Sequence, residues 1–414
     1  MTQPGLPLEV LSHIIDDVNS KGDLCSMSLA SRTLRDECQR ALFRHTGILK
    51  IELPELAENK FLDSIIDSPH RLALLVRSFE AHLVWERPVE HQGCVIRDIE
   101  AFMQRNKSDP KNLDSIVKFI DKIERALVLM TNLKNLRILA TGNKDLPETV
   151  LSLPHILRKC TFQLHDFYWE HVRSDGDLII SKFLSQQSAL RSFELPLSRR
   201  QSGQQYARAL RVYAAAGQLN LNLETLSGPA EMTVGLLNRA DGKRSRTQYL
   251  RWTMGHPKRC GSADGLPHLS GILCNIRLFH VDYNPIGRDT SEYVPLDIFP
   301  FLDNLRVLRF STGNIGGITQ EHLDTLAKLP KLQVLVMVVQ IGINFYEHDT
   351  VKTVAENLFS CCGSLEYIDI ESFRINASTE RLMRYISKRH GVPKNGEYSW
   401  DDRHQFVEID ENDK

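Results

Sequence analysis

The stretch Leu305-Arg306-Val307-Leu308-Arg309-Phe310 decides how the larger part of this sequence is interpreted. Its apolar residues follow the pattern aliphatic-x-x-aliphatic-x-aliphatic, and the last two alternate with a polar residue, as in a short strand with one buried face. Clear copies of the pattern are Ile276-x-x-Phe279-x-Val281, Leu332-x-x-Leu335-x-Met337 and Leu365-x-x-Ile368-x-Ile370. Looser copies centre on Phe79, Leu139, Phe162, Phe193, Leu226, Leu250 and Val407. A unit that recurs along most of the chain predicts an architecture of stacked repeats.

Amphipathic helices are expected between several of these strands. Asp349 is expected to cap a helix whose apolar face is Val351, Val354, Ala355, Leu358 and Phe359. The long interval after Phe79 contains a second apolar face, formed by Ile116, Phe119, Ile120, Ile123, Leu127 and Met130. Strand, turn and helix in alternation predict an α/β fold, a solenoid with a curved parallel sheet in which neighbouring repeats bury each other's faces.

Over residues 70 to 410 this pattern resembles the leucine-rich-repeat family in its irregular form, because repeat lengths vary and no regular Asn or Cys ladder follows the strands. The alternative is a conventional α/β domain with leucine-rich strands. In a solenoid, the residue between the last two apolar positions of each strand faces the concave surface. Those residues are Glu80, Glu194, Arg251, His280, Arg309, Val336 and Asp369. Their mixed charges favour a protein partner over a polyanion, although ordinary solvated strand polarity explains each one singly.

The first 46 residues form a different kind of segment, beginning Leu6-Pro7-Leu8-Glu9-Val10. Leu8, Leu11, Ile14, Ile15 and Val18 recur at helical spacing and predict one apolar stripe. Asp23 is predicted to cap a second helix, Leu24 to Leu29, and Ser31 a third that runs to Phe43. Three short helices are at the lower limit of independent stability, so this module is expected to lean on the rest of the chain or on another protein.

The order of residues from 4 to about 46 resembles the F-box family. The residues that carry the resemblance are Leu6-Pro7, Glu9, Val10-Leu11, Ile14-Ile15, Val18, Asp23-Leu24, Met27, Leu29-Ala30-Ser31-Arg32, Leu34 and Leu42-Phe43. One departure is Leu34, where the family commonly has Trp, which leaves the strength of adaptor docking open. The alternative is an ordinary helical hairpin that caps the larger domain.

The two resemblances together are typical of a fungal-type F-box protein with irregular leucine-rich repeats. They imply the substrate-recognition subunit of a Skp–cullin–F-box ubiquitin ligase, with cullin and RING subunits reached through the Skp-type adaptor and an unknown target protein on the repeats. The adaptor-binding residues so implied are Leu6, Pro7, Val10, Leu11, Ile14, Leu24, Met27 and Leu29. The two resemblances imply no catalytic residue, metal or cofactor in this chain. A protein-binding scaffold without a ligase role is the alternative; an enzyme with a site around His280 or His165 is the third hypothesis.

The expected domain organisation follows from these segments. It comprises residues 1–46 as the F-box module, 47–130 as a linking segment with the first strand and helices, 131–410 as the solenoid and 411–414 as a tail.

Composition limits the partners and the compartment. The chain has 414 residues, 42% hydrophobic and 25% charged, with a formal net charge of -1, so we expect neither nucleic acid nor a membrane as a partner. No long uninterrupted apolar run occurs, and the acidic residues Glu9, Asp16 and Asp17 stand where a signal peptide would be apolar. The eight cysteines form no C-x-x-C pair, as expected of reduced thiols in the cytoplasm or nucleus.

Enzymatic motifs are weak. His165 and His171 flank an aromatic segment that we expect to be a surface loop, because their spacing does not suit a two-histidine metal site on a helix. Cys361-Cys362 is expected to pack in the core or end a helix, and Gly313–Gly317 lacks the ending of a phosphate-binding loop. The basic region of Lys243-Arg244-Ser245-Arg246 with Lys258-Arg259 is expected to be a solvated loop.

Overall fold

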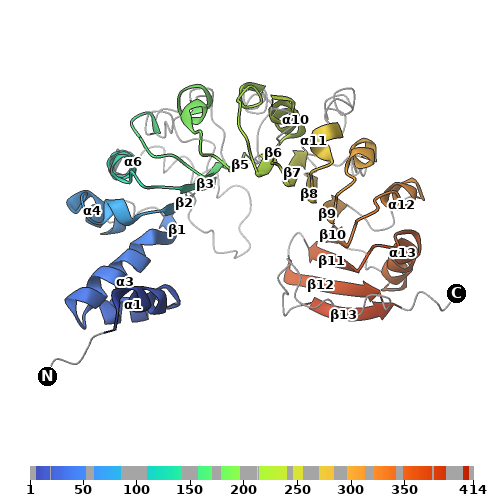
Figure 1. Ribbon diagram of the computed structural model, residues 1–414, viewed down its shortest axis with the longest axis horizontal. Helices are drawn as coiled ribbons and strands as arrows, with labels where there is room; N and C mark the ends of the chain where they lie inside the picture. The colour runs from blue at the N-terminus through green and yellow to red at the C-terminus, as the bar shows by residue number, and fades with distance from the viewer. Residues whose placement is uncertain are drawn as a thin grey trace. The chain divides into compact units, whose positions relative to one another are not determined.

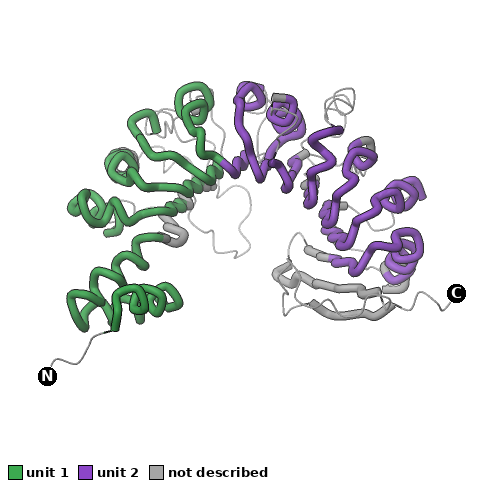
Figure 2. Tube along the Cα trace, in the orientation of Figure 1, with its two compact units in different colours: residues 1–190 green, residues 191–414 purple. Residues whose placement is uncertain are grey.

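The computed structural model describes most of the repeat strands and the N-terminal helices. The residues described are 6–18, 20–52, 60–84, 110–141, 157–169, 179–195, 212, 214–239, 246–254, 270–283, 296–312, 320–341, 348–374, 377–387 and 404–409. The predictions for Lys243–Ser245, Lys258-Arg259, Gly313–Gly317, His171 and the 411–414 tail lie outside these residues. The chain divides into two compact units, residues 1–190 and 191–414 (Figure 2).

Unit 1 begins with three helices at the expected places, α1 (Leu8–Asp16), α2 (Lys21–Ser28) and α3 (Arg32–Arg44). We call residues 6–44 the three-helix module. Its core is Ile15, Leu24 and Cys38, with Leu11, Val18, Met27, Leu34, Ala41 and Leu42 packed around them. The predicted N-cap Asp23 is wrong: the Ser20 side chain accepts the Asp23 N–H at 3.2 Å, so the helix starts one turn earlier. The predicted cap Ser31 is confirmed, since its Oγ accepts the Leu34 N–H at 3.1 Å.

The rest of unit 1 consists of parallel strands and the helices between them. The strands are β1 (His45–Glu52), β2 (Ser78–Val84), β3 (Asn135–Thr141) and β4 (Asp166–Trp169), and each pairs in parallel with the next. The helical segments are α4 (Lys60–Asp67), η2 (Ala73–Leu75), α6 (Pro110–Leu129), η3 (Ile179–Phe183) and η4 (Leu184–Gln186). Helix α6 is the one predicted for the long interval after Phe79, and its Ile123 and Leu127 are buried.

Strand β4 corrects two predictions. The repeat centred on Phe162 is out of place, because the strand is Asp166–Trp169, in register with Asn135 to Ile138 of β3. The aromatic segment predicted as a surface loop is therefore a strand, in which Phe167 and Trp169 are buried. Phe162 is buried too, against the ring of Phe183, so it belongs to the core beside the strand.

Unit 2 continues the same design. Its strands are β5 (Ser192–Glu194), β6 (Thr225–Gly228), β7 (Tyr249–Met254), β8 (Leu278–Tyr283), β9 (Val307–Thr312), β10 (Val334–Ile341), β11 (Tyr367–Arg374), β12 (Ala377–Ser387) and β13 (His404–Ile409). Its helical segments are α10 (Ala230–Arg239), α11 (Ser270–Leu273), η8 (Leu296–Phe301), α12 (Gln320–Leu326) and α13 (His348–Cys361). Within unit 2 the helices lie on one side of the strands (Figure 1).

The predicted parallel sheet is confirmed from β5 to β11, in which each strand pairs in parallel with the next. Strand β12 departs from the prediction, because it runs antiparallel to β11, with pairs from Tyr367 and Ile386 to Arg374 and Ala377. Strand β13 pairs in parallel with β12. The loose copy centred on Val407 lies in β13.

The apolar positions of the repeat pattern form the core of unit 2. Phe279 is fully buried, and its ring makes edge-to-face contacts with Trp252 at 5.2 Å and Phe299 at 6.4 Å between centroids. Leu308 and Leu335 occupy the equivalent position in β9 and β10 and are also fully buried. In the described part of the chain, no helix has the length and apolar character needed to cross a membrane.

Just ahead of the strands, side-chain hydrogen bonds tie several repeats to the repeat before them. The Asn304 Nδ2 donates to the Cys274 carbonyl at 2.7 Å, the Thr247 hydroxyl to Leu223 at 2.8 Å and the Ser364 hydroxyl to Leu332 at 2.9 Å. In unit 1, Asn132 makes the same bond to Leu74 at 2.9 Å. These bonds form a ladder between repeats, which is made by Asn, Thr and Ser side chains and lies just before the strands.

Candidate protein-binding surfaces

The three-helix module exposes large apolar side chains on α1 and at the end of α2. The exposed fractions are 65% for Leu6, 51% for Leu8, 43% for Val10, 46% for Ile14 and 80% for Leu29. Among the described residues, the other large apolar side chain that is exposed is Leu74. We call Leu6, Leu8, Val10, Ile14 and Leu29 the module's apolar surface. A soluble protein gathers apolar side chains in this way where another surface covers them.

The eight predicted adaptor-binding residues divide into two groups. Leu6, Pro7, Val10, Ile14 and Leu29 are exposed. Leu24 is buried in the core of the module, and Leu11 and Met27 pack against that core. Leu8 is exposed and absent from the predicted set, although it belongs to the same apolar stripe in the sequence. Leu34, which stands where the F-box family commonly has Trp, packs against the module's core and so affects its packing.

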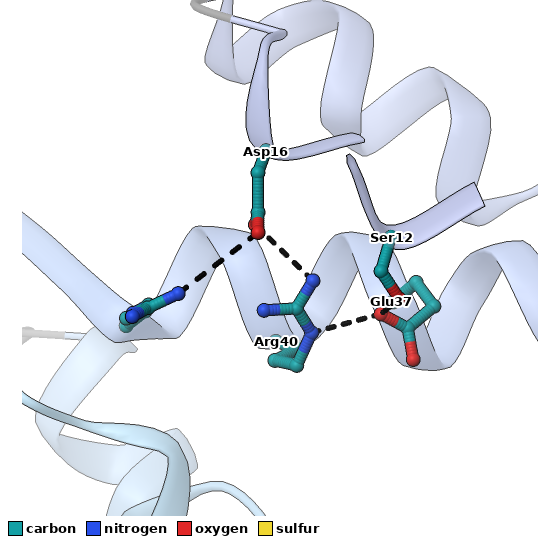
Figure 3. Close-up of polar contacts among 5 residues, drawn as sticks. Ser12, Asp16, Glu37 and Arg40 are labelled. Atoms are coloured by element: carbon teal, nitrogen blue, oxygen red, sulfur yellow. Dashed lines mark hydrogen bonds and ion pairs between the residues drawn. The ribbon is translucent and has the colours of Figure 1, made fainter. Parts of the chain in front are cut away.

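A polar network joins α1 to α3 (Figure 3). The Ser12 hydroxyl and the Arg40 Nε both donate to Glu37 Oε2, at 2.7 Å and 2.8 Å. Arg40 Nη2 also donates to Asp16 Oδ1 at 3.1 Å. Burial alone would raise the pKa of Glu37, but the hydrogen bonds from Arg40 and Ser12 and the Arg40 charge lower it below its ordinary value. The network fixes how α1 lies on α3, and thereby where the apolar surface sits.

The module is joined to the first repeat without a linker. Helix α3 ends at Arg44 and β1 begins at His45. The Phe43 ring stacks on Phe61 of α4 at 5.6 Å between centroids, and Phe61 stacks on Phe79 of β2 at 6.4 Å. The module is thus packed on the repeats of unit 1 through an aromatic stack.

The predicted target-binding residue of unit 1 lies in a polar row across the strands. Glu80 is in register with Arg137 of β3, which is in register with Tyr168 of β4. The Arg137 Nε lies 3.8 Å from Glu80 Oε1, and its guanidinium carbon lies 4.6 Å from the centre of the Tyr168 ring. Tyr168 is absent from the predicted set, because the repeat was predicted at Phe162, ahead of the strand Asp166–Trp169 that contains Tyr168.

The predicted residues of unit 2 also form one row. The register places Glu194, Ser227, Arg251, His280, Arg309, Val336, Asp369 and Arg384 next to one another on successive strands. We call this set the strand row of unit 2. Its members on β5 to β11 sit between the buried repeat positions, on the face of the strands opposite the helices, because successive strand residues point to opposite faces.

Exposure varies along the strand row. Glu194, Arg251 and Arg309 are half-buried, whereas His280 and Asp369 are only 8% and 3% exposed. Val336 is buried in a cluster with Val334 and Tyr367, against which Val307 packs. The row therefore combines accessible charges near β5 to β9 with an apolar cluster near β10 and β11. Ser227 belongs to the row and is absent from the predicted set.

The described residues that had suggested chemistry are dispersed. His165 lies just before β4, far along the sequence from the His280 strand, and in the described residues no three His, Cys, Asp or Glu side chains gather as metal ligands. Cys361 ends α13 and is exposed, while Cys362 is buried. Burial, with a smaller effect of Cys361, raises the pKa of the Cys362 thiol to about 12, so that thiol is protonated at neutral pH.

Comparisons with known proteins give matches among solved structures but none among family models or curated proteins. Among solved structures, the chain is similar to the leucine-rich repeat-containing protein LegL7 from Legionella pneumophila. The identity is 14%, the match covers 80% of this chain and 85% of that chain, and the TM-score is 0.37. The repeat architecture described above rests on this chain's own strand register and buried positions.

Proposed function

We propose that this chain is the substrate-recognition subunit of a Skp–cullin–F-box ubiquitin ligase, an F-box protein of the fungal type with irregular leucine-rich repeats. The observation that carries the proposal is the module's apolar surface. Leu6, Leu8, Val10, Ile14 and Leu29 are exposed on a module whose sequence order resembles the F-box. Covering such side chains supplies the main favourable term in most protein association.

In this proposal the Skp-type adaptor covers the apolar surface, and cullin and RING subunits join through the adaptor. Leu11, Leu24 and Met27 would contribute to adaptor binding indirectly, because they hold α1 and α2 together from inside the module. The network of Ser12, Glu37 and Arg40 keeps α1 in one orientation, which reduces the ordering cost of docking.

The strand rows are the proposed surface for a target protein. The rows contain both acidic and basic side chains, together with Tyr168 in unit 1 and the valine cluster in unit 2, a mixture typical of protein recognition. The reaction itself would belong to the other subunits, and this chain would contribute proximity, with no cofactor or nucleophile of its own. The free cysteines among the described residues agree with action in the cytoplasm or nucleus.

Co-expression with a Skp-type adaptor tests the docking surface. The variant Val10→Glu/Ile14→Glu introduces charges on the exposed side of α1, and we expect it to lose copurification with the adaptor while its circular dichroism spectrum stays unchanged. The matched control is Thr33→Glu/Arg35→Gln, which changes the net charge equally at exposed positions of α3. Equal adaptor recovery in wild type and Val10→Glu/Ile14→Glu would overturn the proposal.

Ubiquitin transfer separates a ligase receptor from a protein-binding scaffold. A complex reconstituted with adaptor, cullin, RING subunit and a captured target is expected to modify that target, and Val10→Glu/Ile14→Glu to abolish the modification. Adaptor binding with no transfer to any captured target would favour the scaffold.

A further inference from the structure

Unit 2 contains a groove of about 520 Å³ at the edge where its strands begin. It is lined by Glu224, Arg246, Gln248, Asn275, Arg277, Asn304, Arg306 and Lys331. None of these residues belongs to the strand row, because each lies ahead of the strand that follows it. The groove is therefore a second surface, separate from the proposed target-binding row.

The groove is lined by residues at equivalent positions of consecutive repeats. Arg277 immediately precedes β8 and Arg306 immediately precedes β9, so they hold the same position in consecutive repeats. The Arg306 N–H donates to the Arg277 carbonyl at 2.8 Å, which ties the two backbones together. Neighbouring strands lie about 4.8 Å apart, so the two side chains leave the backbone side by side. Lys331 and Arg246 lie one repeat further on either side.

The groove is strongly cationic. It holds four cationic side chains and one carboxylate, that of Glu224. Lys331 Nζ contacts Asn304 Oδ1 at 2.6 Å, a neutral partner. Within the described residues, Arg246, Arg277 and Arg306 form no ion pair. Like charges held side by side with so little acidic compensation attract an anion.

The corresponding place in unit 1 is different. Arg77 immediately precedes β2, as Arg277 precedes β8, but its Nη1 donates to the Asn132 carbonyl at 3.2 Å. Arg277 and Arg306 make no such bond to the next repeat within the described residues. Their guanidinium groups thus keep their donors for a ligand.

We propose that this groove binds a phosphate group, carried either by a protein side chain or by a small phosphorylated compound. A phosphate monoester offers three acceptor oxygens and nearly two negative charges, which suits two adjacent guanidinium forks with a lysine beside them. Asn275 and Gln248 add neutral donors at the rim. A nucleic acid is disfavoured, because the chain's formal net charge is -1 and the groove is lined by four cationic side chains, which suits one or two phosphates better than a long polyanion. The inference does not depend on adaptor docking.

Isothermal titration with inorganic pyrophosphate tests the site on the full-length chain. We expect binding to the wild type that weakens with added salt, and an affinity at least about tenfold lower in Arg277→Gln/Arg306→Gln. The matched control is Arg191→Gln, since Arg191 is exposed, immediately precedes β5 and does not line the groove. Its affinity is expected to equal that of the wild type. Equal pyrophosphate affinity in Arg277→Gln/Arg306→Gln, or no binding to the wild type, would overturn the proposal.

Two further arms identify what carries the phosphate. A pool of phosphoserine peptides with degenerate flanks that binds more tightly than pyrophosphate, while the same pool with serine does not bind, assigns the site to a phosphorylated protein. Pyrophosphate binding without a gain from the peptide pool assigns it to a small compound. An oligothymidylate that needs Arg277 and Arg306 while pyrophosphate fails to bind would replace the proposal with a nucleic-acid site. Because the arginines are exposed, unchanged thermal unfolding of Arg277→Gln/Arg306→Gln verifies that each comparison is made on folded protein.

Discussion

The three-helix module and unit 2 treat their apolar side chains in opposite ways. The module leaves Leu6, Leu8, Val10, Ile14 and Leu29 exposed around a small core. In unit 2, none of the large apolar side chains whose exposure the structure describes is exposed, and the repeat positions such as Phe279 and Leu308 are buried. Neighbouring repeats bury each other's apolar side chains, whereas the module buries those of its core and leaves those of its surface exposed. This difference separates stability from binding: substitutions in unit 2 should change mainly the free energy of unfolding, and substitutions on the module's surface mainly association.

The largest effect is expected from Phe279→Ala. The ring is fully buried and packs edge-to-face against Trp252 and Phe299, so its removal leaves a cavity and should cost about 3–5 kcal/mol of unfolding free energy. Chemical denaturation followed by tryptophan fluorescence measures it. A cost below about 1 kcal/mol would mean that the interior of unit 2 is not closely packed, and the contrast with the module would fail.

A smaller loss is expected from Asn304→Ala. This change removes the hydrogen bond to the carbonyl of half-buried Cys274 and the exposed contact from Lys331 Nζ, at a cost of about 1–2 kcal/mol. Asn275→Ala is the matched control, because Asn275 occupies the same repeat position, is exposed and makes no side-chain hydrogen bond within the described residues. Equal denaturation midpoints for the two variants would argue that the ladder does not contribute to cohesion.

Glu37→Gln is expected to cost about 1 kcal/mol at neutral pH, through weaker hydrogen bonds to Arg40 and Ser12. The pKa of Glu37 is lower in the folded chain than its ordinary value of 4.5, so the carboxylate stabilises the module above that pH. This contribution is lost as the pH falls through the folded-state pKa. Denaturation of wild type and Glu37→Gln between pH 3 and 7 should therefore converge toward the acid end. Parallel curves over that range would exclude a role for the Glu37 charge.

The smallest effect on stability is expected from Ile14→Ala, within about 0.5 kcal/mol, because the side chain is nearly half exposed. Adaptor affinity measured by titration should nevertheless fall, whereas Phe279→Ala should leave it unchanged under conditions in which the variant is folded. A large loss of stability in Ile14→Ala would show that the surface is covered by this chain itself, and would remove the contrast between module and repeats.

Periodicity alone predicted much of this fold. The strands at β8 to β11 and the helix α6 could be predicted because several large apolar residues recur there without interruption. The failures have local causes. The repeat predicted at Phe162 belongs at Phe167 of β4, and sequence alone misplaced it because Phe162 is also a large apolar residue that is buried. Ser20 and Asp23 are both good caps, and sequence alone does not choose between them. The antiparallel direction of β12 is not predicted by the spacing of apolar residues.

The candidate surfaces were less predictable than the fold. Register follows from the repeat pattern, so the strand row could be located, but the burial of His280 and Asp369 depends on neighbours that spacing does not reveal. The phosphate groove was missed, although a signal existed. Ile276-Arg277 and Leu305-Arg306 place arginine after the first aliphatic residue in two consecutive copies, and comparing the polar positions between copies would have found it.

The ladder ahead of the strands has a mechanical consequence. Several repeats of unit 2 are tied to their predecessors by a side-chain bond such as Asn304 to Cys274, and the paired strands add backbone bonds. Repeats contact mainly their neighbours, so tension applied to the chain ends loads one interface at a time. Under a steady pull, unit 2 should lengthen in steps, each releasing one repeat, on the order of 100 Å of extended chain. A machine that threads and pulls proteins would therefore meet a series of small barriers here in place of one large one.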